Sequence, residues 1–377
     1  MPEILSSMLN YIRSKFDRNR PSQSLKHLYN DLNQPIDGKP LSSRPSSSSL
    51  ADVNPDEQSE SVSKRYSELE EFLGAAVTGN LINGKPAKPE EIERCIEIAI
   101  EHDILFVIAL RINDIGRELR RVVSNVWNLL LKLEHPKTKE RSLVTYLISH
   151  TGCIGTLFSA YAAKSEGVIN IGVMLRDSLK SPEIAKYAFQ HGLIPKLFDV
   201  ITAANFDVSA DAFQTMREAL TNHKDLGCAW LVDNYDSFFT RYMVLLDATS
   251  SDDSYVLVRQ ALNMLATVVL DRSFMQLMLR CVDDEALLKH ILMLLTHKSK
   301  VIELESFHIL KVFVANPNKH PRVEKILRVN TTRIVKLLDR IEESRPDDKD
   351  FLLDKRAVVA KLEALAPHSA SDSESKA

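Results

Sequence analysis

The amino-acid sequence predicts an all-α protein built from stacked helical repeats. Only 11 of its 377 residues are Gly, and the commonest apolar residues favour helix over strand. Few segments show the alternation of polar and apolar residues that is typical of a half-buried strand. Similar helices recur at steps of 41 to 48 residues, the period of armadillo or HEAT units. Because one such unit cannot cover its own apolar face, we expect the units to stack into a curved rod.

The ends of the chain differ in composition from its middle. Residues 1–33 lack the continuous apolar core of a secretory signal, and we predict an N-terminal amphipathic helical segment over this range. Residues 34–64 are rich in Ser, Pro and acidic residues, so we predict a disordered linker. Its serines are candidate phosphorylation sites, but a linker without such a role is the favoured interpretation. We expect an armadillo-like repeat domain over residues 65–366 and a disordered tail over residues 367–377.

Matching helices define the repeats inside this body. The run around Arg176 recurs around Arg217, a step of 41. The run around Asp211 recurs around Arg259 and then Glu305, steps of 48 and 46. The last helix of each unit lines the concave side of such a rod, so its exposed positions are the first place to seek a binding site. The candidates are Arg217, Glu218, Thr221, Lys224, Tyr255, Arg259, Asn263, Glu305, His308 and Lys311.

Composition and cysteine spacing exclude several classes of function. A net charge of −3 and a pI of about 6.4 give no indication of nucleic-acid binding. The four cysteines form no Cys-x-x-Cys pair, so we expect buried, reduced thiols of an intracellular protein, with neither zinc nor disulfides. The apolar runs are too short to span a membrane. We therefore predict a soluble protein without metal, cofactor, nucleic-acid partner or stable membrane insertion.

Two runs resemble ligand-binding loops but lack essential residues. Gly79–Pro86 approaches a phosphate-binding loop, yet Pro86 occupies the position of the required Ser or Thr. A run that begins like a calcium loop at Asp52 has Glu57 and Ser63 where Gly and Glu are required. No nucleophile or kinase motif accompanies them. We predict a connecting loop at Gly79–Pro86 and no enzymatic activity.

The strongest local charge lies between Asn316 and Arg340. Seven Lys and Arg residues stand there against Glu324 and Asp339, at spacings that form stripes along helices. One interpretation is a plain solvated face. The other is a site for an acidic or carboxylate-ended peptide, in which the apolar stems of the basic side chains cover apolar residues of the peptide.

Residues 307–319, which read Phe-His-Ile-Leu-Lys-Val-Phe-Val-Ala-Asn-Pro-Asn-Lys, resemble a signature of the mouse protein 25 family, also called calcium-binding protein 39-like. The runs Gly172–Arg176, Ser181–Ala185, Phe206–Phe213 and Leu270–Arg272 support the resemblance, which covers residues 66–365. The Ser-rich insertion is similar to that of fungal, hyphal-morphogenesis-type members.

The resemblance implies a horseshoe of armadillo-like repeats without catalytic activity. Members of this family act as scaffolds that bind and activate sterile-20-type, germinal-centre-like protein kinases or a pseudokinase through the concave face. A pocket near the C-terminal end takes a Trp-Glu-Phe-like motif from the partner's tail. We therefore expect a monomer in a heteromeric complex, a role in polarity and morphogenesis signalling, and a cytoplasmic location concentrated at sites of polarised growth or division.

The resemblance also assigns binding residues. The kinase-binding positions are Tyr255, Arg259, Arg272 and Met275, of which Met275 replaces an aromatic residue beside Phe274. The peptide-binding positions are Asn263, Lys289, Leu292, Arg328 and Arg333, several of which differ from the family residue.

A transport adaptor of the armadillo type, or another peptide-binding adaptor, is the alternative. That class uses ladders of Trp and Asn with acidic pockets for basic peptides. Only Trp127 with Asn128 suggests such a ladder, and the C-terminal region is basic.

Overall fold

The structure is a computed structural model that describes residues 21–33, 55–150, 152–163, 167–203, 206–247 and 252–365. Residues 1–20 of the predicted amphipathic segment, linker residues 34–54 and the tail after residue 365 lie outside the described residues. Within the described ranges the chain is helical, with one isolated β-bridge and no strand. Contacts divide it into two compact units, Met1–Ala219 and Leu220–Ala377.

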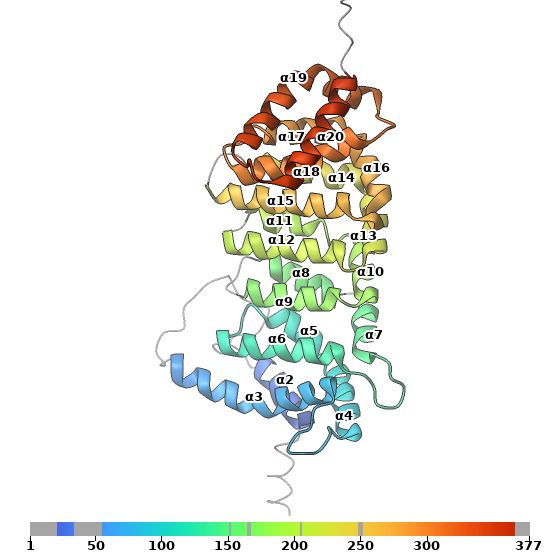
Figure 1. Ribbon diagram of the computed structural model, residues 1–377. Coiled ribbons are helices and arrows are strands. Elements are labelled where there is room, and N and C mark those ends of the chain that lie inside the picture. The colour runs from blue at the N-terminus through green and yellow to red at the C-terminus, as the bar shows by residue number, and fades with distance from the viewer. Residues whose placement is uncertain are drawn as a thin grey trace, which may run out of the picture. The chain divides into compact units, whose positions relative to one another are not determined.

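The first unit is a stack of three-helix repeats. Helices of equivalent position pack on one another, α6 on α3 and α9, α4 on α7, and α5 on α8, and in Figure 1 α3, α6, α9 and α12 run side by side. This arrangement confirms the predicted helical-repeat fold. The helices are α2 (Pro21–Asn33), α3 (Pro55–Thr78), α4 (Pro89–Glu101), α5 (Ile104–Arg111), α6 (Arg117–Lys132), α7 (Ser142–Ser149), α8 (Cys153–Ala162), α9 (Val168–Leu179), α10 (Pro182–Gln190), α11 (Lys196–Ala203) and α12 (Phe206–Thr221).

The second unit continues the same pattern and ends with two longer helices. Here α13 packs on α16, α14 on α17 and α15 on α18, and α20 then packs on both α18 and α19. Its elements are α13 (Lys224–Asp233), α14 (Tyr235–Leu246), α15 (Asp252–Leu270), the 3₁₀ turn η2 (Arg272–Phe274), α16 (Met275–Val282), α17 (Glu285–Leu294), α18 (Lys300–Ala315), α19 (Pro321–Glu343) and α20 (Lys349–Leu365).

The N-terminal boundaries differ from those predicted. Helix α2 packs on α3, α4 and α5 through Leu25, Leu28 and Leu32, which are at most 1% exposed, and Arg111 Nε donates to the Leu32 carbonyl at 3.0 Å. Helix α3 begins at Pro55, ten residues before the predicted domain start. The physical reason is that the first repeat would otherwise expose an apolar face, which α2 covers.

Trp127 is a core residue of the first unit and not part of a surface ladder. Its side chain is fully buried in α6, and its Nε1 donates to Ser178 Oγ on α9 at 2.9 Å. The pair fixes α6 against α9 because a buried indole N–H needs an acceptor.

The predicted loop at Gly79–Pro86 is confirmed. Asn83 and Gly84 both have positive φ angles, 49° and 77°, as in a type I′ turn. Ile82 and Lys85 close this turn with two backbone hydrogen bonds of 2.7 and 3.0 Å.

The cysteines are free and buried, as the sequence predicts. Burial raises the pKa of the Cys153 and Cys281 thiols to about 12, so both stay protonated at neutral pH. No single described helix is long and apolar enough to cross a membrane. Among the described helices, one pair, α7 and α8, has the length and composition of a membrane span when taken together, but it is bent by 75°.

Candidate partner-binding surface of the second unit

Helix α15 presents three of the predicted binding residues on one stripe. Tyr255, Arg259 and Asn263 follow one another at spacings of four residues, so they lie on the same side of the helix. Tyr255 is half-buried, whereas Arg259 and Asn263 are exposed. Val258 and Leu262, on an adjacent side of the helix, are buried and hold it in place. Within the described part of the chain, the Arg259 guanidinium makes no hydrogen bond or ion pair, so its donors are available to a partner.

The turn after α15 holds Arg272 in a fixed position. Asp271 caps this turn, because its Oδ1 accepts from the Ser273 backbone N–H at 2.9 Å and its Oδ2 pairs with Lys224 Nζ at 2.7 Å. The hydrogen bond from Lys224, then that from the Ser273 N–H, lowers the pKa of Asp271 to about 2. Arg272 itself is exposed and has no ion pair among the described residues.

Met275 provides an apolar contact beside Arg272. Met275 and Leu279 lie one turn apart at the start of α16, and each is 53% exposed. Phe274, the aromatic residue next to Met275, is 1% exposed and belongs to the core, so it is not available to a partner. We call Tyr255, Arg259, Arg272 and Met275 the arginine surface. About 17 Å of helix separates Arg259 from the end of α15, so these residues suit an extended face of a partner and not a small ligand.

The basic residues of α19 are divided by the geometry of the helix. Each residue advances about 100° around a helix axis, so Arg328 and Arg333 point about 140° apart. Arg333 shares a side with Arg322 and Arg340, which contact Glu285 of α17 and Glu303 of α18. Arg328 lies instead on the side of Asp339, which pairs with Lys355 of α20.

This division separates Arg328 from the other predicted peptide-binding residues. Lys289 and Leu292 lie on α17, which packs against α19, so the side of α19 that carries Arg333 faces them. Lys289 is exposed and 3.6 Å from Glu285, and Leu292 is half-buried beside Met293, which is 57% exposed. We call Lys289, Leu292, Met293 and Arg333 the α17–α19 surface. Asn263 belongs to the α15 stripe.

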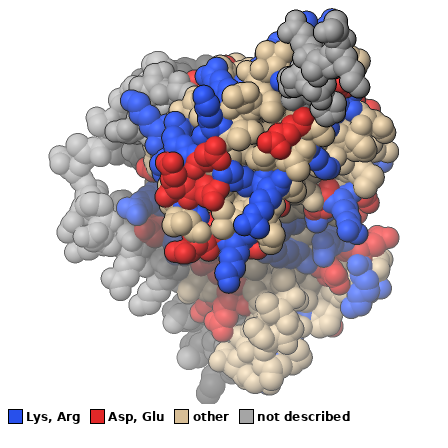
Figure 2. Space-filling view, turned by 45° about the horizontal axis from the view of Figure 1, so that its top comes forward, with Lys and Arg blue, Asp and Glu red and all other residues tan. Residues whose placement is uncertain are grey.

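Several basic side chains of this region have structural partners. Lys319 Nζ donates to the Val314 and Asn316 carbonyl oxygens at the end of α18, and Arg340 pairs with Glu303, which is 2% exposed. Lys325, Arg328, Arg333 and Lys336 have no ion pair within the described chain. Figure 2, in which the end that carries α19 and α20 comes forward, shows Lys and Arg side chains gathered there with Asp and Glu between them.

Helix α20 covers two residues that the repeat pattern places among the binding candidates. Lys311 Nζ pairs with Asp354 of α20 at 2.5 Å, and His308 is half-buried. Burial, with the charge of Lys311, lowers the pKa of His308 below its usual range. The Lys311–Asp354 pair therefore joins α18 to α20.

Comparison with known proteins gives the family. The sequence matches the Mo25-like family model over residues 17–366. It is 28% identical over 314 residues to the calcium-binding protein 39-like of Mus musculus, covering 83% of this chain and 89% of that protein. It is 34% identical over 220 residues to the degreening-related gene dee76 protein of Auxenochlorella protothecoides, covering 58% and 67%.

A fungal relative and a solved structure complete the comparison. The conidiophore development protein hymA of Emericella nidulans is 27% identical over 304 residues, covering 74% of this chain and 78% of that protein. A designed armadillo repeat protein matches with a TM-score of 0.38 and 13% identity, over 77% of this chain and 99% of that one. The family match spans nearly the whole helical array and includes both surfaces described above, so the chain belongs to the Mo25-like family.

Proposed function

We propose that this chain is a non-catalytic scaffold that binds and activates a sterile-20-type protein kinase or pseudokinase. The observation that carries the proposal is the arginine surface, where two guanidinium groups without partners in the described chain stand on rigid elements beside Tyr255 and Met275. Arg offers planar, bidentate donors, which suit the carboxylates of a folded partner. Exposed Arg and aromatic residues are also the types that dominate binding energy at interfaces.

The α17–α19 surface is the proposed site for a Trp-Glu-Phe-like motif in the partner's tail. Lys289 and Arg333 supply positive charge for the Glu, while Leu292 and Met293 supply apolar area for the two aromatic side chains. Two linked contacts with one partner raise the overall affinity, since the second contact forms within the complex.

Activation follows from differential binding. A scaffold that binds the closed kinase more tightly than the open kinase shifts the population toward the closed state by the ratio of the two affinities. We place this activity in polarity and morphogenesis signalling, with a cytoplasmic location concentrated at sites of polarised growth or division. The name of the fungal relative, a conidiophore development protein, supports the morphogenesis part of the proposal.

The test measures kinase affinity and kinase activity with single substitutions. Arg259→Ala and Arg272→Ala are each expected to weaken binding of a recombinant sterile-20-type kinase by about 2 kcal/mol, roughly thirtyfold in Kd. Both variants should also lose most of the stimulation of kinase activity.

Arg356→Ala is the matched control, because Arg356 is an exposed arginine of α20 without an ion pair among the described residues. It should bind and stimulate as the unchanged protein does. Full binding and full stimulation by the Arg259→Ala, Arg272→Ala double variant would contradict the proposal.

A further inference from the structure

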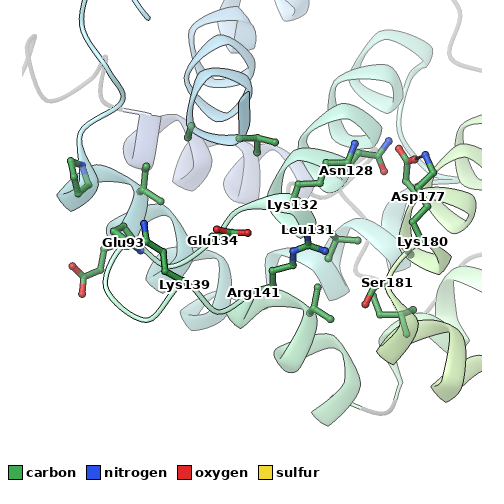
Figure 3. A pocket seen from close by; sticks show the side chains of 18 of the residues that line it. Glu93, Asn128, Leu131, Lys132, Glu134, Lys139, Arg141, Asp177, Lys180 and Ser181 are labelled. Atoms are coloured by element: carbon green, nitrogen blue, oxygen red, sulfur yellow. Dashed lines mark hydrogen bonds and ion pairs between the residues drawn. The ribbon is translucent and has the colours of Figure 1, made fainter. Parts of the chain in front are cut away.

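The first unit contains a cavity whose lining residues belong to neither of the two surfaces described in the second unit. It has a volume of about 920 Å³ (Figure 3). The C-terminal ends of α3, α6 and α9 line it, together with the starts of α4 and α10 and the loop between α6 and α7. All of its lining residues fall between Ala76 and Ile184, so the cavity belongs wholly to the first unit.

Asn128 brings an unsatisfied amide to the wall of this cavity. The residue is 9% exposed, and its enclosed Oδ1 has no hydrogen-bond partner among the described residues. No described residue bonds to its Nδ2 either. In Figure 3, Asn128 lies beside Asp177, where α6 and α9 meet. A buried polar group left unpaired is costly, so a bound group that pairs with this amide would recover that cost.

The side chains around the cavity carry an excess of available positive charge. Lys137 pairs with Glu93 at 2.9 Å, and Lys180 pairs with Asp177. Three further lining cations have no ion pair among the described residues, namely Lys132, Lys139 and Arg141. Two lining carboxylates, those of Glu90 and Glu134, also have no ion pair with a described residue, so three available cations stand against two available anions. The cavity is therefore suited to a negatively charged ligand.

The loop that carries two of these cations is held in place. The His135 N–H donates to the Glu140 carbonyl at 2.9 Å, and the Lys139 N–H donates to the His135 carbonyl at 2.8 Å. Figure 3 shows Arg141 pointing from this loop toward Leu131 at the end of α6. A cation positioned before binding loses less conformational entropy when the ligand arrives.

Shape and chemistry together favour a peptide. A single inorganic ion would fill only a small part of 920 Å³, and no described residues form a group of three or more metal-ligand side chains. A side-chain amide offers one planar acceptor with adjacent donors, which match the C=O and N–H groups of a peptide backbone. In an extended chain, successive side chains point to opposite sides. Acidic side chains can then meet the cations while apolar ones meet Val77, Leu131 and Ile184.

We propose that this cavity binds an extended acidic peptide segment of a protein partner. Asn128 pairs with the peptide backbone, and Lys132, Lys139 and Arg141 bind its carboxylates. The site shares no residue with the arginine surface, and the proposal does not depend on the kinase proposal.

The test uses the fluorescein-labelled peptide Gly-Leu-Glu-Leu-Glu-Leu-Glu-amide and the full chain, with binding followed by fluorescence anisotropy. The peptide is expected to bind, and its affinity should fall as salt concentration rises. The same peptide with Gln or Lys in place of Glu should bind at least about tenfold more weakly, because the complementary charge is removed or reversed.

Variants of the chain locate the site. Arg141→Glu should weaken binding of the Glu peptide by about tenfold or more, whereas Arg117→Glu, an equal charge change at the other end of α6, should leave binding within about twofold. Asn128→Leu should weaken binding similarly while thermal stability stays equal or rises, since the variant removes an unpaired buried amide.

Four outcomes would overturn the proposal: no binding of the Glu peptide, equal binding of the Gln peptide, equal losses in Arg141→Glu and Arg117→Glu, or displacement by inorganic phosphate alone. The last outcome would identify a simple anion site.

Discussion

Close contacts explain several residues that carry the family resemblance. A Cβ at Gly172 would lie 1.9 Å from Asp211 Oδ2, so any other residue there would displace the Asp211 carboxylate. The Asp211 carboxylate also binds Arg176 Nη1 at 2.8 Å and the Tyr161 hydroxyl at 2.5 Å. Gly172, Arg176 and Asp211 therefore hold two repeats together, which is a structural role and not a partner contact.

Gly227 offers the sharpest test at this scale. A Cβ there would lie 2.0 Å from the Leu220 carbonyl oxygen, an overlap with backbone that a rotamer change cannot relieve. Gly227→Ala is therefore expected to lower the free energy of unfolding by about 3 kcal/mol. Urea denaturation followed by circular dichroism measures this change.

Gly155→Ala is the control, because nothing lies within 4 Å of a Cβ at that position of α8. It should raise the free energy of unfolding by up to about 1 kcal/mol, the helix preference for Ala over Gly. Equal stability of the two variants would show that the contact at Gly227 is not tight.

At the scale of elements, helical period divides side chains that are neighbours in sequence. The basic residues of α19 read as one block, yet Arg333 lies toward α17 and α18 while Arg328 lies toward α20. The same block contains Arg340 and Lys319, which serve the fold. The number of basic residues in the sequence is therefore larger than the number that one partner could contact.

We predict that charge reversal affects peptide binding on one side of α19 and not on the other. Arg333→Glu should weaken binding of a labelled peptide ending in Trp-Glu-Phe by about tenfold or more, because it reverses charge on the α17–α19 surface. Arg328→Glu makes the same charge change on the other side of the helix and should alter Kd by less than about threefold. Isothermal titration with both variants measures the difference. Equal losses would contradict a site on one side of α19, and a larger loss in Arg328→Glu would place the peptide over the α20 side.

For the whole molecule, local contacts predict separate binding sites. In stacked repeats each unit contacts its neighbours, and the cavity and the arginine surface belong to different compact units without a shared side-chain partner. Substitutions at such sites usually act additively.

Arg141→Glu should therefore leave the affinity for the sterile-20-type kinase within about twofold, and Arg259→Ala should leave acidic-peptide binding unchanged. Surface plasmon resonance on single and double variants tests both statements. A coupling free energy above about 0.5 kcal/mol would show that one partner engages both sites.

Much of the fold follows from the sequence. Helical period and scarce glycine predict the helices, and recurring helices predict the stacking that α15 on α18 displays. The N-terminal boundaries do not follow in the same way. Helix α2 is polar on average, and only its contacts with α3, α4 and α5 show that Leu25, Leu28 and Leu32 belong to the core.

The candidate sites follow from the sequence in part. Spacing alone puts Tyr255, Arg259 and Asn263 on one stripe of α15. The choice between Phe274 and Met275 depended on which side chain the neighbouring helices cover. Asn128 carried one signal in sequence, its position beside Trp127, but its unpaired amide became visible only with the cavity around it.

The sequence by itself determined the helical repeats, the buried cysteines and the connecting loop at Gly79–Pro86, because helix period, apolar burial and turn chemistry are local properties. Tertiary structure decided which polar side chains remain available to a partner. Arg340 and Lys311 are paired, whereas Arg259 and Arg272 have no ion pair with any described residue. That outcome depends on residues tens of positions away in the chain, since a charge is available only where no packed helix brings an opposite charge to it.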